Sequence, residues 1–132
     1  MRYRIIVGSL VIVACIGIVA VSQSVADTAV KWASVNLTDP TQIAGAFVSG
    51  PVVFVHDDAK MAAGKPCTSV HRFIPGKGVG EELVAFHCTP RRGQAPDKFT
   101  QAVTTTSDGL RVMTEYQFAG DKEAHAIPKS AR

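Results

Sequence analysis

The sequence predicts an all-β domain, a small antiparallel sandwich or barrel of about six strands, preceded by one N-terminal hydrophobic helix. Three observations lead to this prediction. An uninterrupted apolar run is confined to residues 5–21, the rest of the chain alternates short strand-like stretches with Gly/Pro turns, and that part holds two widely spaced cysteines. The chain therefore divides into a membrane-directed segment and an exported β body.

Charge and length limit the class of protein. The chain has 132 residues, with 14 Lys+Arg against 11 Asp+Glu and a formal charge of +3. Residues 27–132 carry 12 of the basic and all 11 of the acidic side chains, so the body is nearly neutral. A body of this size forms one domain, and it lacks the clustered basic surface of a nucleic-acid binder. We expect no nucleic-acid partner.

Residues 1–26 have the order of a targeting segment. Arg2 and Arg4 precede the apolar run, and the small residues Ser24 and Ala26 stand at the positions that a signal peptidase reads before Asp27. Cleavage between Ala26 and Asp27 is one interpretation. A retained signal-anchor transmembrane helix is the other, because a membrane span needs roughly 17 to 25 apolar residues. Either way the body is exported: anchored in the inner membrane and facing the periplasm or the outside, or secreted or periplasmic after cleavage.

The exported body divides into three parts. Residues 27–42 form a polar lead-in, which we interpret as a tether or a short first strand over residues 30–35, with a turn at Asp39-Pro40. Residues 43–119 form the β domain, and residues 120–132 form a polar C-terminal tail. Within the β domain, β-branched and aromatic residues predict strands over residues 43–48, 52–56, 68–74, 82–88, 99–106 and 110–118.

Two hairpins and one helical turn are the clearest local predictions. Asp108-Gly109 between alternating segments is a strong signal for a tight hairpin. The glycine-rich stretch 75–80 joins the strand over residues 68–74 to the strand over residues 82–88. A single helical turn is expected over residues 58–63.

Cys67 and Cys88 predict a disulfide, because cysteine pairs in small exported domains are usually oxidised. If the two are cross-strand partners, paired residue numbers sum to 155, which places Val84 opposite His71 and Phe86 opposite Ser69. A bridge closing a loop of about twenty residues would stabilise the domain by roughly 3 kcal/mol.

A metal site is the alternative use of these cysteines. Cys67, His71, His87 and Cys88 form a Cys2His2 set. Along a strand, however, Cys67 and His71 would lie about 13 Å apart, and the adjacent His87 and Cys88 would point to opposite faces. The sequence therefore predicts no metal and no cofactor there, and it predicts that His125 lies in a solvated tail.

Other polar residues have two interpretations each. Asp57 and Asp58, directly after His56, could bind a hard cation, but an aspartate at the end of a strand more often caps the next helical turn. Lys77, at the tip of the glycine-rich hairpin, together with Arg91 and Arg92, would give a modestly basic surface for contact with a partner.

The sequence contains no Gly-x-Ser-x-Gly or His-Glu-x-x-His motif. We therefore expect a non-catalytic exported domain, membrane-tethered through residues 5–21, that acts as an accessory or interaction subunit of a membrane-associated complex. The alternative is a periplasmic metal- or cofactor-binding module using His56, Met61, His71 and His87, because imidazole and thioether groups ligate copper and haem iron. A small hydrolase with dispersed catalytic residues is a third possibility.

Overall fold

The computed structural model describes residues 30–131 and confirms the all-β class. The expected hydrophobic helix and its cleavage site lie outside these residues, and no helix within residues 30–131 is long and apolar enough to cross a membrane. In this range the elements are β1 (Val30–Ile43), β2 (Ala46–Asp57), α1 (Asp58–Ala62), β3 (Thr68–Ile74), β4 (Gly78–Phe86), β5 (Thr89–Arg92), β6 (Thr100–Thr105), β7 (Arg111–Gln117) and β8 (Glu123–Ala126).

The strands form a single mixed sheet in the order β4-β3-β2-β1-β7-β8-β5, with β6 pairing to β7 beyond this path. All pairs are antiparallel except β1 and β7, which run parallel and meet at Gln42 and Val112. The sheet is not closed, because its end strands β4 and β5 are not neighbours in this order. The prediction of an antiparallel sandwich or barrel of about six strands was therefore wrong on three points, since the sheet has eight strands, contains one parallel pair and does not close into a barrel.

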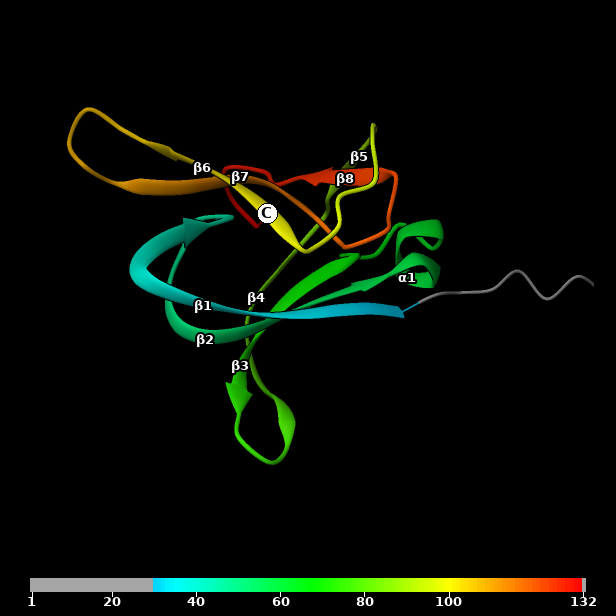
Figure 1. Cartoon of the computed structure of the whole chain (residues 1–132), viewed down its shortest axis with the longest axis horizontal. Helices are drawn as coiled ribbons and strands as arrows, with labels where there is room; N and C mark the ends of the chain where they lie inside the picture. Colours follow the sequence, from blue (N-terminus) through cyan, green and yellow to red (C-terminus); the bar gives the residue numbers. More distant parts are fainter. Residues whose placement is uncertain (1–29, 132) are drawn as a thin grey trace, which may run out of the picture.

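The sheet folds over so that its two halves enclose the core. In Figure 1, β5 to β8 run across the top of the view and β1 to β4 lie below them. Phe54 of β2 meets Tyr116 of β7 with ring centroids 5.2 Å apart. Phe86 of β4 and Met113 of β7 are also buried in this cluster. The aromatic contacts across the fold hold the two halves in a fixed relation, which positions residues from distant parts of the chain.

Both ends of the body are more ordered than the sequence suggests. Residues 30–42 of the lead-in belong to β1, a strand of 14 residues whose pairing with β2 shifts between Leu37 and Thr41. Pro40 lies in this irregular stretch, and a proline cannot donate a ladder hydrogen bond. The expected C-terminal tail contains β8, which pairs with both β7 and β5.

The two predicted hairpins both form. β6 and β7 pair around Asp108-Gly109, and β3 pairs with β4. The β3–β4 register differs from the prediction by one residue, since Val84 lies opposite Val70 and Phe86 opposite Thr68. The pairing also shifts on either side of His71. Close to these shifts a Cβ on Gly80 would lie 2.8 Å from the backbone oxygen of Arg72, so only glycine fits there.

Candidate metal centre

Three side chains from distant parts of the chain converge on one point. Cys88 Sγ lies 3.5 Å from His56 Nε2 and 3.6 Å from His125 Nδ1. These three atoms all lie within 4.8 Å of one another. Because both histidines are 1% exposed and Cys88 is half-buried, the cluster lies just beneath the surface.

Strand geometry positions the two histidines. His56 continues an alternating, inward-facing series in β2 that includes the fully buried Val52 and Phe54. His125 lies in β8 opposite Tyr116 of β7, and the two rings stack with centroids 5.1 Å apart. The imidazoles themselves are 4.2 Å apart. Packing inside the fold therefore fixes both rings.

The thiol comes from the connection between two strands. Cys88 lies in the irregular segment after β4 and before β5. Its backbone N–H donates to Cys67 Sγ over 3.1 Å. The segment is therefore anchored although it belongs to neither strand.

A carboxylate faces the outer nitrogen of each imidazole. Asp58 Oδ1, in the first turn of α1, lies 3.2 Å from His56 Nδ1. Asp121 Oδ2 lies 3.9 Å from His125 Nε2. Neither outer nitrogen makes a hydrogen bond of good geometry, so these contacts are mainly electrostatic. A carboxylate behind a histidine is the usual outer shell of a metal-ligating imidazole, because it fixes the tautomer and the orientation of the ring.

The negative charge of these carboxylates favours one tautomer of each imidazole. A neutral imidazole has one N–H and one lone pair, and the N–H belongs on the side that faces the carboxylate. The lone pairs of His56 Nε2 and His125 Nδ1 then both point toward Cys88 Sγ. One thiol hydrogen can satisfy only one of them. A metal ion bound to all three atoms would satisfy both lone pairs and the sulfur together.

The separations match those of ligands that share one ion. Bonds of about 2.3 Å to sulfur and about 2.05 Å to nitrogen, meeting at a tetrahedral angle, place the two ligand atoms about 3.6 Å apart. The observed Sγ-to-nitrogen distances are 3.5 and 3.6 Å. The two sulfur-to-nitrogen separations therefore already suit a shared ion, and the two nitrogens lie within 4.8 Å of each other.

Burial keeps both imidazoles neutral. Desolvation is the largest influence on each and lowers the pKa of both His56 and His125, with only partial compensation from Asp58 and Asp121. Neutral imidazole is the form that binds metals, since its lone pair is free.

Asp121 is held in place by two donors. Lys31 Nζ donates to its Oδ2 over 2.7 Å, and the backbone N–H of Glu123 donates to its Oδ1 over 3.0 Å. Burial alone would raise the pKa of Asp121, but these hydrogen bonds outweigh it and the pKa is lowered. The carboxylate behind His125 is therefore ionised at neutral pH and fixed in position.

The two body cysteines lie next to each other as free thiols in this structure rather than as the predicted disulfide. Burial, followed by the neighbouring Cys67 thiol, raises the pKa of Cys88 to about 12. Cys67 is not a member of the three-residue ligand group. It is buried beneath Cys88, beside Thr68, whose hydroxyl hydrogen-bonds to that of Tyr116.

The other metal candidates from the sequence lie elsewhere. His71 uses both ring nitrogens, one against Gly80 O at 3.1 Å and one against Ser69 Oγ at 2.8 Å. His87 is exposed, and Met61 belongs to α1 rather than to the ligand group. The Cys2His2 set of Cys67, His71, His87 and Cys88 does not assemble.

Asp57 and Asp58 have different roles. Asp57 is the N-cap of α1, where its Oδ1 accepts from the N–H groups of Ala59 and Lys60. This confirms the capping interpretation for Asp57. Asp58 instead faces His56.

The proposed basic contact surface is also dispersed. Lys77 lies in the turn between β3 and β4, at the bottom of Figure 1, whereas Arg91 and Arg92 lie in β5 at the top. Arg91 makes a two-bond ion pair with Glu115, at 2.6 and 3.0 Å, and this pair lowers the pKa of Glu115. The structure does not bring the three cations together.

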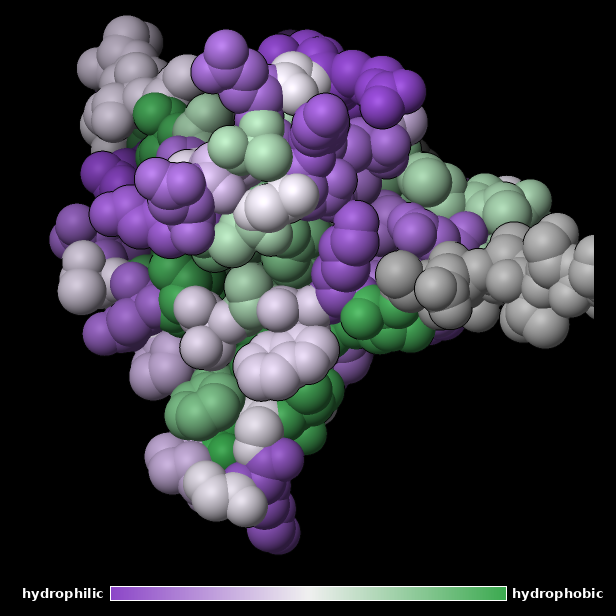
Figure 2. All heavy atoms as spheres, turned by 45° about the vertical axis from the view of Figure 1, so that its right-hand side comes forward, coloured by the Kyte–Doolittle hydropathy of each residue, from purple (hydrophilic) through white to green (hydrophobic). Residues whose placement is uncertain are grey.

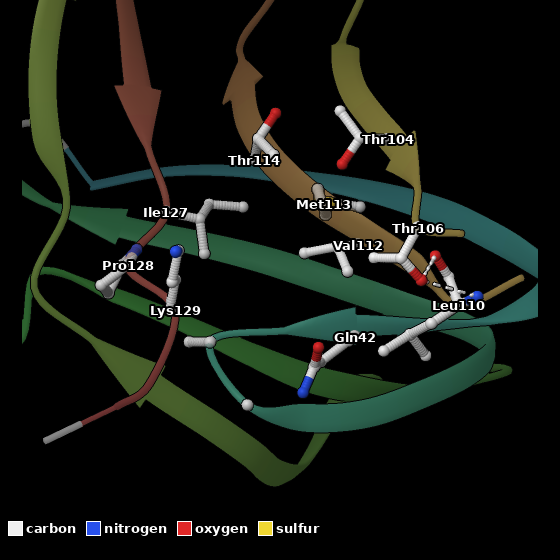
Figure 3. A pocket seen from close by; sticks show the side chains of 12 residues that line it. Gln42, Thr104, Thr106, Leu110, Val112, Met113, Thr114, Ile127, Pro128 and Lys129 are labelled. Atoms are coloured by element: carbon white, nitrogen blue, oxygen red, sulfur yellow. Dashed lines mark hydrogen bonds between the residues drawn. The ribbon is translucent and has the colours of Figure 1, made fainter. Parts of the chain in front are cut away.

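A pocket of about 530 Å³ lies apart from the cluster, between β7, the end of β6 and the chain that follows β8. Leu110, Val112 and Ile127 point into it (Figure 3). Among residues 30–131, Lys129 is the only charged residue that lines it, and no His, Cys or acidic side chain does. Apart from the Lys129 amine, the described lining therefore offers no group for acid–base or metal chemistry.

Comparisons with protein-family models, with curated proteins and with solved structures found no match to this chain. The argument for function therefore depends on the site itself.

The sequence alone does not bring these three residues together. His56 and Cys88 belong to two different metal hypotheses, Cys88 is predicted to form a disulfide, and His125 is predicted to lie in a solvated tail. The only local signal for β8 is the alternation in Glu123-Ala124-His125-Ala126, which is too short to predict a strand without its neighbours.

Proposed function

We propose that this protein is a metal-binding module that holds a thiophilic transition-metal ion through His56, Cys88 and His125. The observation that carries the proposal is the convergence of two buried imidazole nitrogens on one thiol sulfur, at distances expected for ligands of a single ion. Carboxylates behind both imidazoles support it.

The ligand set selects the class of metal. Thiolate and imidazole together suit Zn²⁺ and copper, whereas Ca²⁺ and Mg²⁺ require oxygen ligands. Cys88 must give up its proton on binding, so the uptake of metal releases a proton. Three protein ligands leave one position of a tetrahedral ion for an external group, such as water or a ligand from a partner.

Metal titration of the reduced full-length chain in detergent tests this proposal. Co²⁺ serves as the spectroscopic probe, because sulfur-to-cobalt charge transfer reports the thiolate directly, and Zn²⁺ is then measured by competition. We expect one equivalent of metal per chain. Cys88→Ser should abolish the charge-transfer band, and His56→Ala or His125→Ala should weaken binding at least 100-fold.

His87→Ala is the matched control, because His87 is exposed and adjacent to Cys88. It should bind metal like the natural chain. The proposal would be overturned if the reduced, folded protein took up no Co²⁺ or Zn²⁺. It would also be overturned if His87→Ala and His125→Ala lost equal metal affinity.

A second candidate function has one observation in its favour. Cys88 Sγ lies 3.5 Å from His56 Nε2, and Asp58 Oδ1 lies 3.2 Å from His56 Nδ1. This is the order of a thiol nucleophile, its base and an orienting carboxylate. The raised pKa of Cys88, about 12, opposes this role because such a thiol stays protonated at neutral pH. Rapid alkylation of Cys88 by iodoacetamide at neutral pH would favour the nucleophile, and slow alkylation would favour the metal site.

The role as a membrane-tethered interaction subunit stays a prediction. Its support is the exposed apolar pair Val30 and Trp32 of β1, 56% and 68% exposed, which follows the apolar segment 5–21 in sequence. Hydrophobic residues also gather at the lower end of the molecule in Figure 2, over the β3–β4 hairpin, where Ile74 and Val79 are exposed. Co-purification from membranes with Trp32→Ser against the natural chain tests this role, and unchanged partners would count against that surface.

A further inference from the structure

We infer that Cys67 and Cys88 form a redox switch that controls the metal site, with the metal bound in the dithiol state and released in the disulfide state. This inference rests on the proposed function, because Cys88 is taken as a ligand. Two observations carry it. Cys67 Sγ is in direct contact with the backbone of Cys88, and Cys67 is outside the ligand group that contains Cys88 Sγ.

The local backbone favours a disulfide between the two residues. Thr68 pairs with Phe86 at the open end of the β3–β4 hairpin, so continuing the register places Cys67 beside His87 and one residue from Cys88. Cys88 lies in the irregular link between β4 and β5, whereas Cys67, just before β3, is held by its carbonyl, which accepts from the N–H of Asp57 over 2.9 Å. Movement of the link that carries Cys88 can therefore bring the sulfur atoms together without breaking the sheet.

The two states exclude each other because they compete for one sulfur. A low-molecular-weight disulfide is the oxidant. The metal-bound thiolate of Cys88, the more exposed of the two residues, attacks it, forming a mixed disulfide and expelling one thiolate. Cys67 sulfur then attacks the Cys88 sulfur, forming the internal disulfide and expelling the second thiolate. Two electrons pass to the oxidant, the Cys67 proton passes to one expelled thiolate, and the metal ion leaves because a disulfide sulfur is a poor ligand.

The experiment uses full-length, Zn²⁺-loaded protein in detergent, equilibrated with glutathione buffers of increasing oxidised fraction. Released zinc is measured with a chromogenic chelator, and thiols are located by alkylation and peptide mass, which separates Cys15 from the body cysteines. We expect one zinc to be released per Cys67–Cys88 disulfide, with a shared midpoint. The disulfide should carry no glutathione adduct.

Cys67→Ala is the decisive variant, with Cys67→Ser as a second replacement should the first fold poorly. The zinc affinity of either variant should lie within about threefold of that of the natural chain. Either variant should also retain zinc in glutathione buffers that remove it from the natural chain. Without the Cys67 thiol, the mixed disulfide at Cys88 cannot become an internal disulfide, and reduced glutathione reverses it.

Three outcomes would overturn the switch while leaving the metal site intact. The first is that zinc stays bound after the disulfide has formed. The second is that Cys67→Ala releases zinc in the same buffers as the natural chain. The third is that reduced Cys67→Ala does not bind zinc. Failure of the reduced natural chain to bind zinc would instead refute the proposed function itself, even if the disulfide still forms.

Discussion

The carboxylate of Asp121 gives the sharpest test of the metal centre. Two substitutions break the same ion pair, but only one of them removes the negative charge behind His125. Lys31 Nζ and Asp121 Oδ2 are 2.7 Å apart, and Asp121 also faces His125. Asp121→Asn removes the charge behind His125. Lys31→Met breaks the ion pair and leaves that charge in place.

The two variants should lose similar stability. The side chain of Lys31 is 37% exposed, so solvent screens the pair, and we expect a decrease of about 1 kcal/mol in the free energy of unfolding of the metal-free protein for either change. Asparagine can still accept the hydrogen bond that the backbone N–H of Glu123 donates to Asp121. Denaturant unfolding measures this effect.

Metal affinity should separate the variants. Loss of a carboxylate behind a ligating histidine weakens binding about 10- to 100-fold, which is about 1.4 to 2.8 kcal/mol. Asp121→Asn should show this loss in Zn²⁺ competition at neutral pH. Lys31→Met should bind as tightly as the natural chain or more tightly, because it removes a nearby positive charge. Equal affinity in both variants, or a larger loss in Lys31→Met, would refute the role of Asp121 behind His125.

Three further predictions concern stability. Burial lowers the pKa values of His56 and His125 in the folded protein. The metal-free protein therefore has its full stability above the unfolded pKa of about 6.5, and it loses up to about 1.4 kcal/mol per histidine for each pH unit below that value. Denaturant unfolding at about pH 7.5 and about pH 5 measures this loss, and unchanged stability would contradict the prediction. Phe54→Ala should cost about 3 to 5 kcal/mol, since this ring is fully buried against Tyr116, and a loss below 1 kcal/mol would mean that the two halves of the sheet do not meet there. Gly109→Ala should cost about 1 to 2 kcal/mol, because Gly109 has φ +86° with open space around it and the strain is purely conformational. Gly93→Ala, whose backbone lacks a positive φ, is the control and should be nearly neutral.

Local chemistry made parts of the fold predictable. The Asp108-Gly109 turn and the glycine-rich link over residues 75–80 contain their own turn signals, and both hairpins form as expected. The Asp57 cap follows from the same kind of local reasoning. Each of these features depends on residues within a few positions of one another.

Features set by long-range packing could not be predicted in this way. The one-residue register difference between β3 and β4 comes from irregular pairing around His71, for which the sequence offers only Gly80 as a hint. The four residues of β8 form a strand because β7 and β5 pair with them on both sides. The ligand cluster depends on both effects, since Cys88 follows β4 and His125 lies in β8.

Charge balance around the cluster narrows the choice of ion. Cys88, once coordinated, contributes one negative charge, and the two imidazoles contribute none. Lys31 already neutralises Asp121, so Asp58 supplies the main remaining negative charge next to the ligands, and Glu123 acts on His56 more weakly. A divalent ion brings this group to neutrality, whereas a monovalent ion leaves one negative charge partly buried, which is unfavourable. The same outer-shell charges that fix the imidazole tautomers therefore favour Zn²⁺ over Cu⁺ at this site.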